Sequence, residues 1–231
     1  DKYFKDHPEW FSEINGRRQT EQAQLCLTNE QMRQELVKNL KEILRNNPLA
    51  TQASVSQNDW AGNCQCARCK VIDDEEGGPA GSILRFVNAV AADIEQEFPK
   101  VAISTLAYTY SQSPPRITRP RPNVVVWLCT MNCSYNLPLN THKRNAQFAG
   151  DLVGWGKIAK RLYIWDYTTN FRHYLFIHPN LRVLGPNVRF FVENNVTGIF
   201  EQGAYHTPGA EMMELRAWVL AKLLWNPRLD D

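Results

Sequence analysis

The sequence lacks an excess of either charge. Among its 231 residues, 26 Lys and Arg stand against 24 Asp and Glu, so the net charge is only +2. This balance argues against nucleic acid or an anionic membrane as the main partner. No run of about eighteen apolar residues occurs, so no transmembrane helix is expected. The chain begins at Asp1 without a signal-peptide pattern, which would fit a mature or trimmed product.

Several catalytic motifs are also missing. No H-E-x-x-H or H-x-H pattern occurs, which argues against a catalytic zinc site built from histidines. No G-x-S-x-G occurs, which argues against an α/β-hydrolase nucleophile. The sequence has neither a dinucleotide-binding glycine pattern nor a phosphate-binding P-loop. No organic cofactor is therefore expected.

What the sequence does contain is an alternation of apolar strands with longer helical patterns. Strands are predicted at 23–27, 52–56, 101–107, 124–129, 162–165 and 196–200. Helices are predicted from a Thr28 cap to Pro48, from Ser82 to Phe98, over about 143–160, from near Pro186, and over the segment that ends at Asn226. Strand-then-helix alternation predicts one α/β domain over 1–231 with a parallel sheet, and favours a (β/α)₈ TIM-type barrel. The chain is slightly short for a complete barrel.

Three carboxylates follow predicted strands directly. Asp59 lies after the second strand, Asp166 after the fifth and Glu201 after the sixth. The carboxyl ends of parallel strands meet on one face, where active sites of this fold class collect. Paired carboxylates there are typical of glycosidases. Each one alone is equally consistent with a cap of the following helix.

Aromatic and polar side chains near these carboxylates are candidates for sugar binding. Aromatic residues make up 11% of the chain, and most of them are expected in the core. Five could offer apolar faces to sugar rings: Trp60, Tyr108, Trp165, Tyr167 and Tyr205. The polar candidates are Asn58, Asn170, Arg172, His173 and Gln202, of which Arg172 and His173 would suit an acidic substituent.

The cysteines give the most specific local pattern. Cys64, Cys66 and Cys69 form C-x-C-x-x-C, and Cys26 ends the neighbouring predicted strand. Four thiolates converging on one ion would make a closed structural zinc site. One or two disulfides are the alternative, favoured in an exported protein. Cys129 and Cys133 either pair or remain thiols, and the sequence does not decide between these.

The arrangement of Cys26, Asn58-Asp59 and the C-x-C-x-x-C segment resembles the family 42 β-galactosidases. In that family an Asn-Glu pair ends the fourth barrel strand, the Glu is the acid/base, and four nearby cysteines bind zinc. The resemblance implies that Asp59 is the acid/base and that the four cysteines hold zinc. The chain departs from the pattern by having Asp in place of Glu.

Nearly the whole chain also resembles an uncharacterised glycoside-hydrolase-like barrel domain of bacterial polysaccharide-degrading proteins, similar in layout to α-glucuronidases and hexosaminidases. The matching stretches are 7–11, 24–29, 56–60, 165–171 and 198–203. This resemblance implies that the six predicted strands are strands three to eight, with the first two upstream of Asp1. It implies Asp59 as the acid, with Asp166 or Glu201 activating water, or Asp166 as the nucleophile.

Two hypotheses follow for function. The first is a glycoside hydrolase that acts on a poly- or oligosaccharide, and the second is a carbohydrate-binding barrel that has lost its activity. A zinc-dependent nucleic-acid module is disfavoured by the charge balance. The family resemblance suggests a periplasmic or extracellular protein, whereas a four-cysteine zinc site would suggest the cytoplasm.

Overall fold

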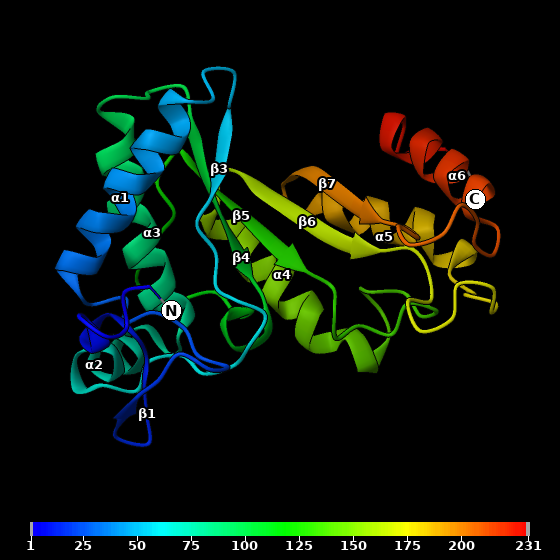
Figure 1. The fold of residues 1–231 in the computed structure, drawn as a ribbon. Helices are drawn as coiled ribbons and strands as arrows, with labels where there is room; N and C mark the ends of the chain where they lie inside the picture. Colours follow the sequence, from blue (N-terminus) through cyan, green and yellow to red (C-terminus); the bar gives the residue numbers. More distant parts are fainter. Residues whose placement is uncertain (1, 230–231) are drawn as a thin grey trace. The chain divides into compact units, whose positions relative to one another are not determined.

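The computed structural model describes residues 2–229 (Figure 1). The main strands are β3 (Gln52–Ser54), β4 (Ala102–Ala107), β5 (Val124–Cys129), β6 (Leu162–Tyr167) and β7 (Val196–Gln202). The helices are α1 (Glu30–Arg45), α2 (Ala67–Glu76), α3 (Ala80–Glu95), α4 (Ala146–Ile158), α5 (Leu181–Glu193) and α6 (Met213–Trp225). A short antiparallel hairpin, β1 (Glu13–Ile14) and β2 (Arg17–Arg18), and 3₁₀ turns at Pro8–Trp10, Thr109–Ser111 and Lys143–Asn145 complete the elements.

The five main strands form one parallel sheet in the order β3-β4-β5-β6-β7. Five of the six predicted strands are therefore confirmed, and no closed barrel is present in residues 2–229. The strand predicted at 23–27 is wrong. Leu25 makes only an isolated antiparallel bridge with Phe11, because this segment bonds to the N-terminal region instead of joining the sheet. One such bond joins the Cys26 amide to the Trp10 carbonyl at 2.8 Å.

The chain divides into two compact units, Asp1–Val126 and Trp127–Asp231, and the division falls inside β5. In the first unit, α3 packs against α1, α2 and β4. Helix α1 starts at a cap formed by Asn29, whose side chain accepts a hydrogen bond from the Met32 amide at 3.0 Å. The predicted cap, Thr28, is wrong by one residue. Its hydroxyl instead lies against cysteine sulfurs.

Helix α2 was not predicted, and its last residue, Glu76, anchors a loop at 113–122 that contains four prolines. Burial of Glu76 raises the pKa of its carboxyl, but hydrogen bonds from Thr118, Ile117 and Arg85 outweigh this effect and hold the pKa at about 2. A side chain at Gly81 would collide with Glu76, since a Cβ there would meet its Cγ at 2.2 Å. Glu76 is thus a buried carboxylate, and both of its oxygens accept hydrogen bonds.

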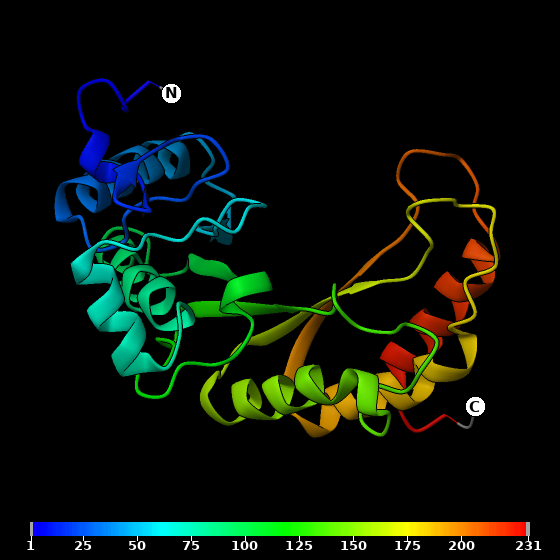
Figure 2. The ribbon, with the colours of Figure 1, turned by 90° about the horizontal axis from the view of Figure 1, so that it is seen from below.

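In the second unit, β6 and β7 pair in parallel, and α5 packs on β7 and on α6 (Figure 2). Helix α5 begins at Leu181, five residues before the predicted start, and it contains Pro186 in its interior. The first turn is held by Asn180, whose side-chain oxygen accepts from the buried Arg216 at 2.6 Å. This anchor stabilises a helical turn ahead of the proline.

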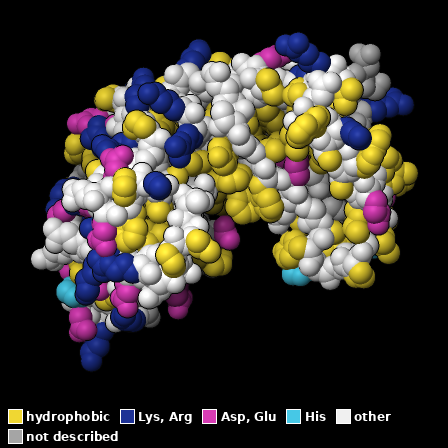
Figure 3. Space-filling view, turned by 90° about the horizontal axis from the view of Figure 1, so that it is seen from above, with side chains coloured by type: hydrophobic (Ala, Val, Ile, Leu, Met, Phe, Trp, Pro, Cys, Tyr) yellow, Lys and Arg dark blue, Asp and Glu magenta, His cyan; other side chains and the backbone are white. Residues whose placement is uncertain are grey.

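On the face drawn in Figure 3, basic and acidic side chains are interspersed, and hydrophobic side chains lie among them. Neither charge forms a continuous patch on that face. Within residues 2–229, no helix is long and apolar enough to cross a membrane.

Candidate functional site

Asp166 and Glu201 lie side by side near the carboxyl ends of β6 and β7. The two residues are direct partners in the strand register, as are Tyr167 and Gln202 one position further on. Parallel pairing in register brings their side chains to the same face of the sheet, because alternate residues point to opposite faces. The structure thus brings together two of the three predicted carboxylates.

The two carboxyl groups have different surroundings. Oδ1 of Asp166 accepts two hydrogen bonds, from Oγ1 of Thr130 at 2.5 Å and from the Tyr167 amide at 2.8 Å. Oε2 of Glu201 is buried and has no hydrogen-bond partner among the described residues. Burial raises the pKa of Asp166, and its two hydrogen bonds only partly offset this rise. Burial and the neighbouring Asp166 charge raise the pKa of Glu201 well above its ordinary value.

Two further residues support this pair, and both were missed in the sequence. Thr130 directly follows β5, and its amide donates to the Trp165 carbonyl at 3.0 Å. The Tyr135 hydroxyl donates to the Thr130 carbonyl at 3.0 Å. Burial, and then the charge of Asp166, raises the pKa of the Tyr135 hydroxyl. The position of Thr130 directly after a predicted strand was the one sequence feature that could have indicated it, and Tyr135 had no such feature.

Aromatic rings at the carboxyl end of β6 and in the loops after β6 and β7 contact one another. Tyr167 meets Phe171 edge-on, with ring centroids 5.7 Å apart, and Phe171 lies 6.3 Å from Tyr205. Tyr205 is 64% exposed, so its ring is available to a ligand. Trp165 is held by a hydrogen bond from its Nε1 to Oε1 of Gln202 at 2.7 Å. Two predicted sugar-binding residues therefore fix each other.

The polar candidates after β6 have simpler positions. The side-chain oxygen of Asn170 accepts from the amides of Arg172 and His173, at 3.1 and 3.2 Å. Asn170 therefore shapes the turn, which is a common use of this side chain. Arg172 and His173 are exposed.

The third predicted carboxylate, Asp59, lies in the first unit, in the loop after β3. Gln24 holds this loop through hydrogen bonds from its Nε2 to the carbonyls of Asn58, Trp60 and Ala61, at 3.0, 2.6 and 3.1 Å. Asn58, Asp59 and Trp60 are all exposed. Asp59 and Trp60 line a surface hollow together with residues 18–22.

Tyr108, also predicted to bind sugar, is buried in the first unit. Its carbonyl accepts from Nε2 of Gln57 at 3.1 Å, and the Tyr108 segment leads into the turn at Thr109–Ser111. The buried ring points to a role in packing.

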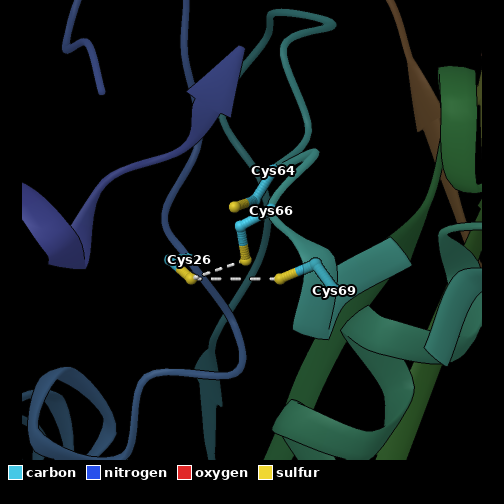
Figure 4. Close-up of side chains that lie close together, drawn as sticks. All are labelled: Cys26, Cys64, Cys66 and Cys69. Carbon is cyan, nitrogen blue, oxygen red and sulfur yellow. Dashed lines mark hydrogen bonds between the residues drawn. The ribbon is translucent and has the colours of Figure 1, made fainter. Parts of the chain in front are cut away.

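The four cysteines of the first unit form a buried cluster (Figure 4). Their sulfur atoms all lie within 4.8 Å of one another. Sγ of Cys26 is 3.7 Å from that of Cys66 and 3.9 Å from that of Cys69. All six cysteines of the chain are free, so the structure does not contain the alternative disulfides.

Local backbone features bring these sulfurs together. Cys66 caps α2 and Cys69 lies in its first turn, while the Phe11–Leu25 bridge positions Cys26. The loop before Cys64 passes very close to residues 22–23. Gly62 has a φ of 62°, and a Cβ there would meet the Gln22 carbonyl oxygen at 2.4 Å. Only glycine satisfies both requirements.

Several donors face the sulfurs. Cys64 accepts from Nη1 of Arg18 at 3.5 Å and from the Glu13 amide at 3.4 Å, and the Thr28 hydroxyl lies 3.3 Å from Cys69. Hydrogen bonds from the thiols of Cys64 and Cys69 lower the pKa of Cys26, and the same contacts raise the pKa of Cys64 and of Cys69. Without a cation the cluster is therefore suited to hold one thiolate, and a bound cation would favour ionisation of the others.

The spacing of the sulfurs fits a tetrahedral metal site. With zinc–sulfur bonds of about 2.3 Å, neighbouring ligand sulfurs in a tetrahedron lie about 3.8 Å apart. The distances of 3.7 and 3.9 Å agree with this value. All four cysteines are buried, and together they could bind one metal ion.

Comparison with known proteins identifies the family and structures of similar fold. No curated protein sequence matches the chain. A solved structure of the GH36 α-galactosidase AgaA from Geobacillus stearothermophilus, in complex with stachyose, is similar in fold with a TM-score of 0.52. The two share 10% identity, and the match covers 99% of this chain but only 29% of that one. All of residues 1–231 match the domain of unknown function DUF4838, and the chain therefore belongs to the DUF4838 family.

Proposed function

We propose that this domain is a glycoside hydrolase and that Asp166 and Glu201 take part in its chemistry. The observation that carries the proposal is the in-register pair of buried carboxyl groups with unlike hydrogen bonding. Glycosidases require carboxyl groups that differ in protonation, and a pair in unlike environments provides this difference. The fold shared with a segment of an α-galactosidase is consistent with the proposal.

Hydrolysis of a glycoside needs two such groups, one as a general acid and one as a base or nucleophile. A neutral carboxyl gives its proton to the glycosidic oxygen while the bond from this oxygen to the anomeric carbon breaks and leaves its electron pair on the oxygen. A carboxylate takes a proton from water as the water oxygen bonds to the anomeric carbon, or bonds to that carbon itself before water replaces it. The sequence predicts Asp59 as the proton donor and Asp166 as the base or nucleophile, with Glu201 as a second candidate for activating water or as a substrate ligand. The unlike surroundings of the pair favour Glu201 as a carboxyl that keeps its proton.

The surroundings of the pair support a sugar ligand. The exposed ring of Tyr205 and the edge-on rings of Tyr167 and Phe171 offer apolar faces of the kind that pack against pyranose rings. In the first unit, Trp60 is 49% exposed beside Asp59 and provides a second such face. The exposed Arg172 and His173 would suit an acidic substituent on the sugar.

We also propose that the four cysteines hold a structural zinc ion. The sulfur spacing and the four-sulfur ligand set favour zinc, and a site with four protein ligands leaves no open position for a substrate. The donors from Arg18, Glu13 and Thr28 would orient the thiolates and offset their charge. The ion would fix the loop that leads to Asp59, since Cys64 follows this loop directly.

A screen of aryl glycosides and defined oligosaccharides against the whole chain tests the enzymatic proposal. The expected result is turnover of at least one glycoside, which Asp166→Asn and Glu201→Gln abolish. The exposed Asp74 and Glu193 offer matched controls, and Asp74→Asn and Glu193→Gln should keep full turnover. Binding of a glycan without turnover of any substrate would instead favour the carbohydrate-binding alternative, which the exposed aromatic rings also fit.

A further inference from the structure

We infer that Asp166 is the ionised member of the carboxyl pair and Glu201 the neutral one, and that Thr130 is the positioning residue that sets this order. The place of the proton is a property of the folded chain. Only its use in turnover rests on the proposed function. The inference separates two roles that the sequence leaves open, because either carboxyl of the pair could activate water.

The first observation is the direction of the hydrogen bonds at Asp166. The Thr130 hydroxyl and the Tyr167 amide both donate to the same oxygen, Oδ1, at 2.5 and 2.8 Å. Donors aimed at a carboxyl favour its charged form, and short bonds between a hydroxyl and an oxygen are typical of a charged acceptor. The Thr130 hydroxyl also lies 3.5 Å from the Trp165 carbonyl, but the contact with Asp166 is much shorter.

The second observation is the different environment of Glu201. Its Oε2 is buried without a partner in the described part of the chain. An ionised carboxylate in this position would be left unsolvated next to a second negative charge, and both effects favour the neutral form. No Lys, Arg or His among residues 2–229 forms an ion pair with either carboxyl.

The other titratable groups around the pair do not supply positive charge. Cys133 and Tyr135 lie near Asp166, Tyr167 lies near Tyr135, and Asp151 lies near Cys133. Burial and then the Asp166 charge raise the pKa of the Cys133 thiol and of the Tyr135 hydroxyl, so both groups are neutral at physiological pH. The pair must therefore lower its charge by keeping a proton, and the hydrogen bonds place that proton on Glu201.

Two hydrogen bonds of its own backbone hold Thr130 in position to donate to Asp166. Its amide bonds to the Trp165 carbonyl at 3.0 Å, and its own carbonyl accepts from the Tyr135 hydroxyl at 3.0 Å. Both bonds fix the backbone beside β6, so the hydroxyl is directed at Asp166 without a large loss of entropy. In turnover, Asp166 would then be the group that accepts a proton from water or bonds to the sugar, and Glu201 would hold the proton that a neutral carboxyl gives to the glycosidic oxygen.

The test is carbon-13 NMR of the full chain with labelled Asp and Glu carboxyl carbons, followed over pH. Asp166→Asn and Glu201→Gln identify the two signals. We expect Glu201 to titrate at a clearly higher pH than Asp166. The reverse order would overturn the inference.

The two variants also give an asymmetric readout that needs no substrate. If Glu201 is neutral while Asp166 titrates, Glu201→Gln should leave the Asp166 midpoint nearly unchanged, because glutamine resembles the neutral acid. Asp166→Asn should lower the Glu201 midpoint, because it removes a neighbouring negative charge. A large shift of Asp166 in Glu201→Gln, with no shift of Glu201 in Asp166→Asn, would contradict the assignment.

Thr130 is tested by Thr130→Val against Thr130→Ser. Loss of the hydroxyl should raise the Asp166 midpoint, and serine should restore it, whereas a purely structural role would change stability without moving the midpoint. An unchanged midpoint in Thr130→Val would exclude the positioning role. If Glu201 titrates at a higher pH than Asp166 but no glycoside is hydrolysed, the proposed function fails and the assignment of the proton to Glu201 stands.

Discussion

Two sets of titratable side chains in residues 2–229 have different surroundings: the four cysteines of the first unit and the Asp166–Glu201 pair of the second. The cysteine cluster faces donors on several sides, including the guanidinium of Arg18. The carboxyl pair has two donors on Asp166 and none on the buried oxygen of Glu201. The first arrangement is suited to several negative charges around a cation, and the second to a single negative charge and a retained proton.

This difference indicates separate roles. A site with all ligands buried and supported by outer donors is typical of structural metal binding. A buried carboxyl without a partner costs stability, and such costs are characteristic of functional sites. We therefore propose that the cysteine cluster stabilises the first unit through a bound ion and that the pair carries the proposed chemistry.

The largest expected effect is loss of the metal site. Cys69→Ala should reduce the zinc content from about one ion per chain to none and lower the melting temperature strongly, because binding of structural zinc supplies of order 10 kcal/mol in small domains. Cys133, which lies outside the cluster, gives the control, and Cys133→Ala should retain the ion. Metal analysis of protein purified without added zinc measures both. Full zinc content in Cys69→Ala would disprove the site.

A smaller effect on zinc binding is expected from loss of Arg18, which donates a hydrogen bond to Cys64. Arg18→Met removes the positive charge beside Cys64 and should weaken zinc binding by roughly 10- to 100-fold, as loss of outer-shell partners does elsewhere. The exposed neighbour Arg17 is the matched control, and Arg17→Met should bind zinc normally. Competition with a chromophoric chelator gives the affinities. Equal affinity in both variants would show that Arg18 does not support the site.

The pH dependence of folding stability should differ in sign between two buried glutamates, Glu76 and Glu201. Glu76 has a folded pKa of about 2 against an ordinary 4.5, so its stabilising effect is present above about pH 4.5 and is lost as the pH falls towards 2. Glu76→Gln should cost about 1–3 kcal/mol at neutral pH. Chemical denaturation at several pH values measures it, and an unchanged stability would contradict the assigned hydrogen bonds.

Glu201 should behave in the opposite way. Its folded pKa is raised, so it favours the folded state at low pH, and this effect is lost as the pH rises through the folded pKa. Glu201→Gln should therefore be more stable than the native chain at high pH and similar to it at low pH. Denaturation curves across this range test the sign. A variant that is less stable at high pH would mean that the Glu201 carboxylate is well solvated.

The smallest effect is expected at the aromatic surface. Tyr205→Ala should weaken glycan binding several-fold without a change in turnover rate at saturation, because the exposed ring would contribute only packing. Leu175, which is 74% exposed, gives the control, and Leu175→Ala should bind normally. Titration with the glycan found in the screen measures both. Equal affinity in the two variants would remove Tyr205 from the binding surface.

Local patterns predicted much of this structure. The C-x-C-x-x-C spacing places Cys64, Cys66 and Cys69 at one helix end, so their proximity follows from the chain itself. Asp166 and Glu201 were predicted to meet because the carboxyl ends of parallel strands lie at one edge of a sheet, and the structure places both residues near the carboxyl ends of neighbouring strands.

Other features depend on contacts that no local pattern encodes. The segment at 23–27 is apolar like a strand, but its bonds go to Trp10 and to the loop held by Gln24. Helix α2 has no clear apolar stripe, so periodicity gave no sign of it. The use of Thr130 follows from the hydrogen bonds that place β5 beside β6, and nothing in its own neighbours predicts it.

The most direct test of the account is the turnover of one glycoside by native chain and by Asp166→Asn, with zinc content and melting temperature measured on the same samples. We predict that the variant keeps its zinc and its melting temperature but loses at least ~10²-fold in turnover, the range expected for removal of an acid–base group. Native-like turnover in a folded, zinc-containing Asp166→Asn variant would contradict the assignment of chemistry to the carboxyl pair.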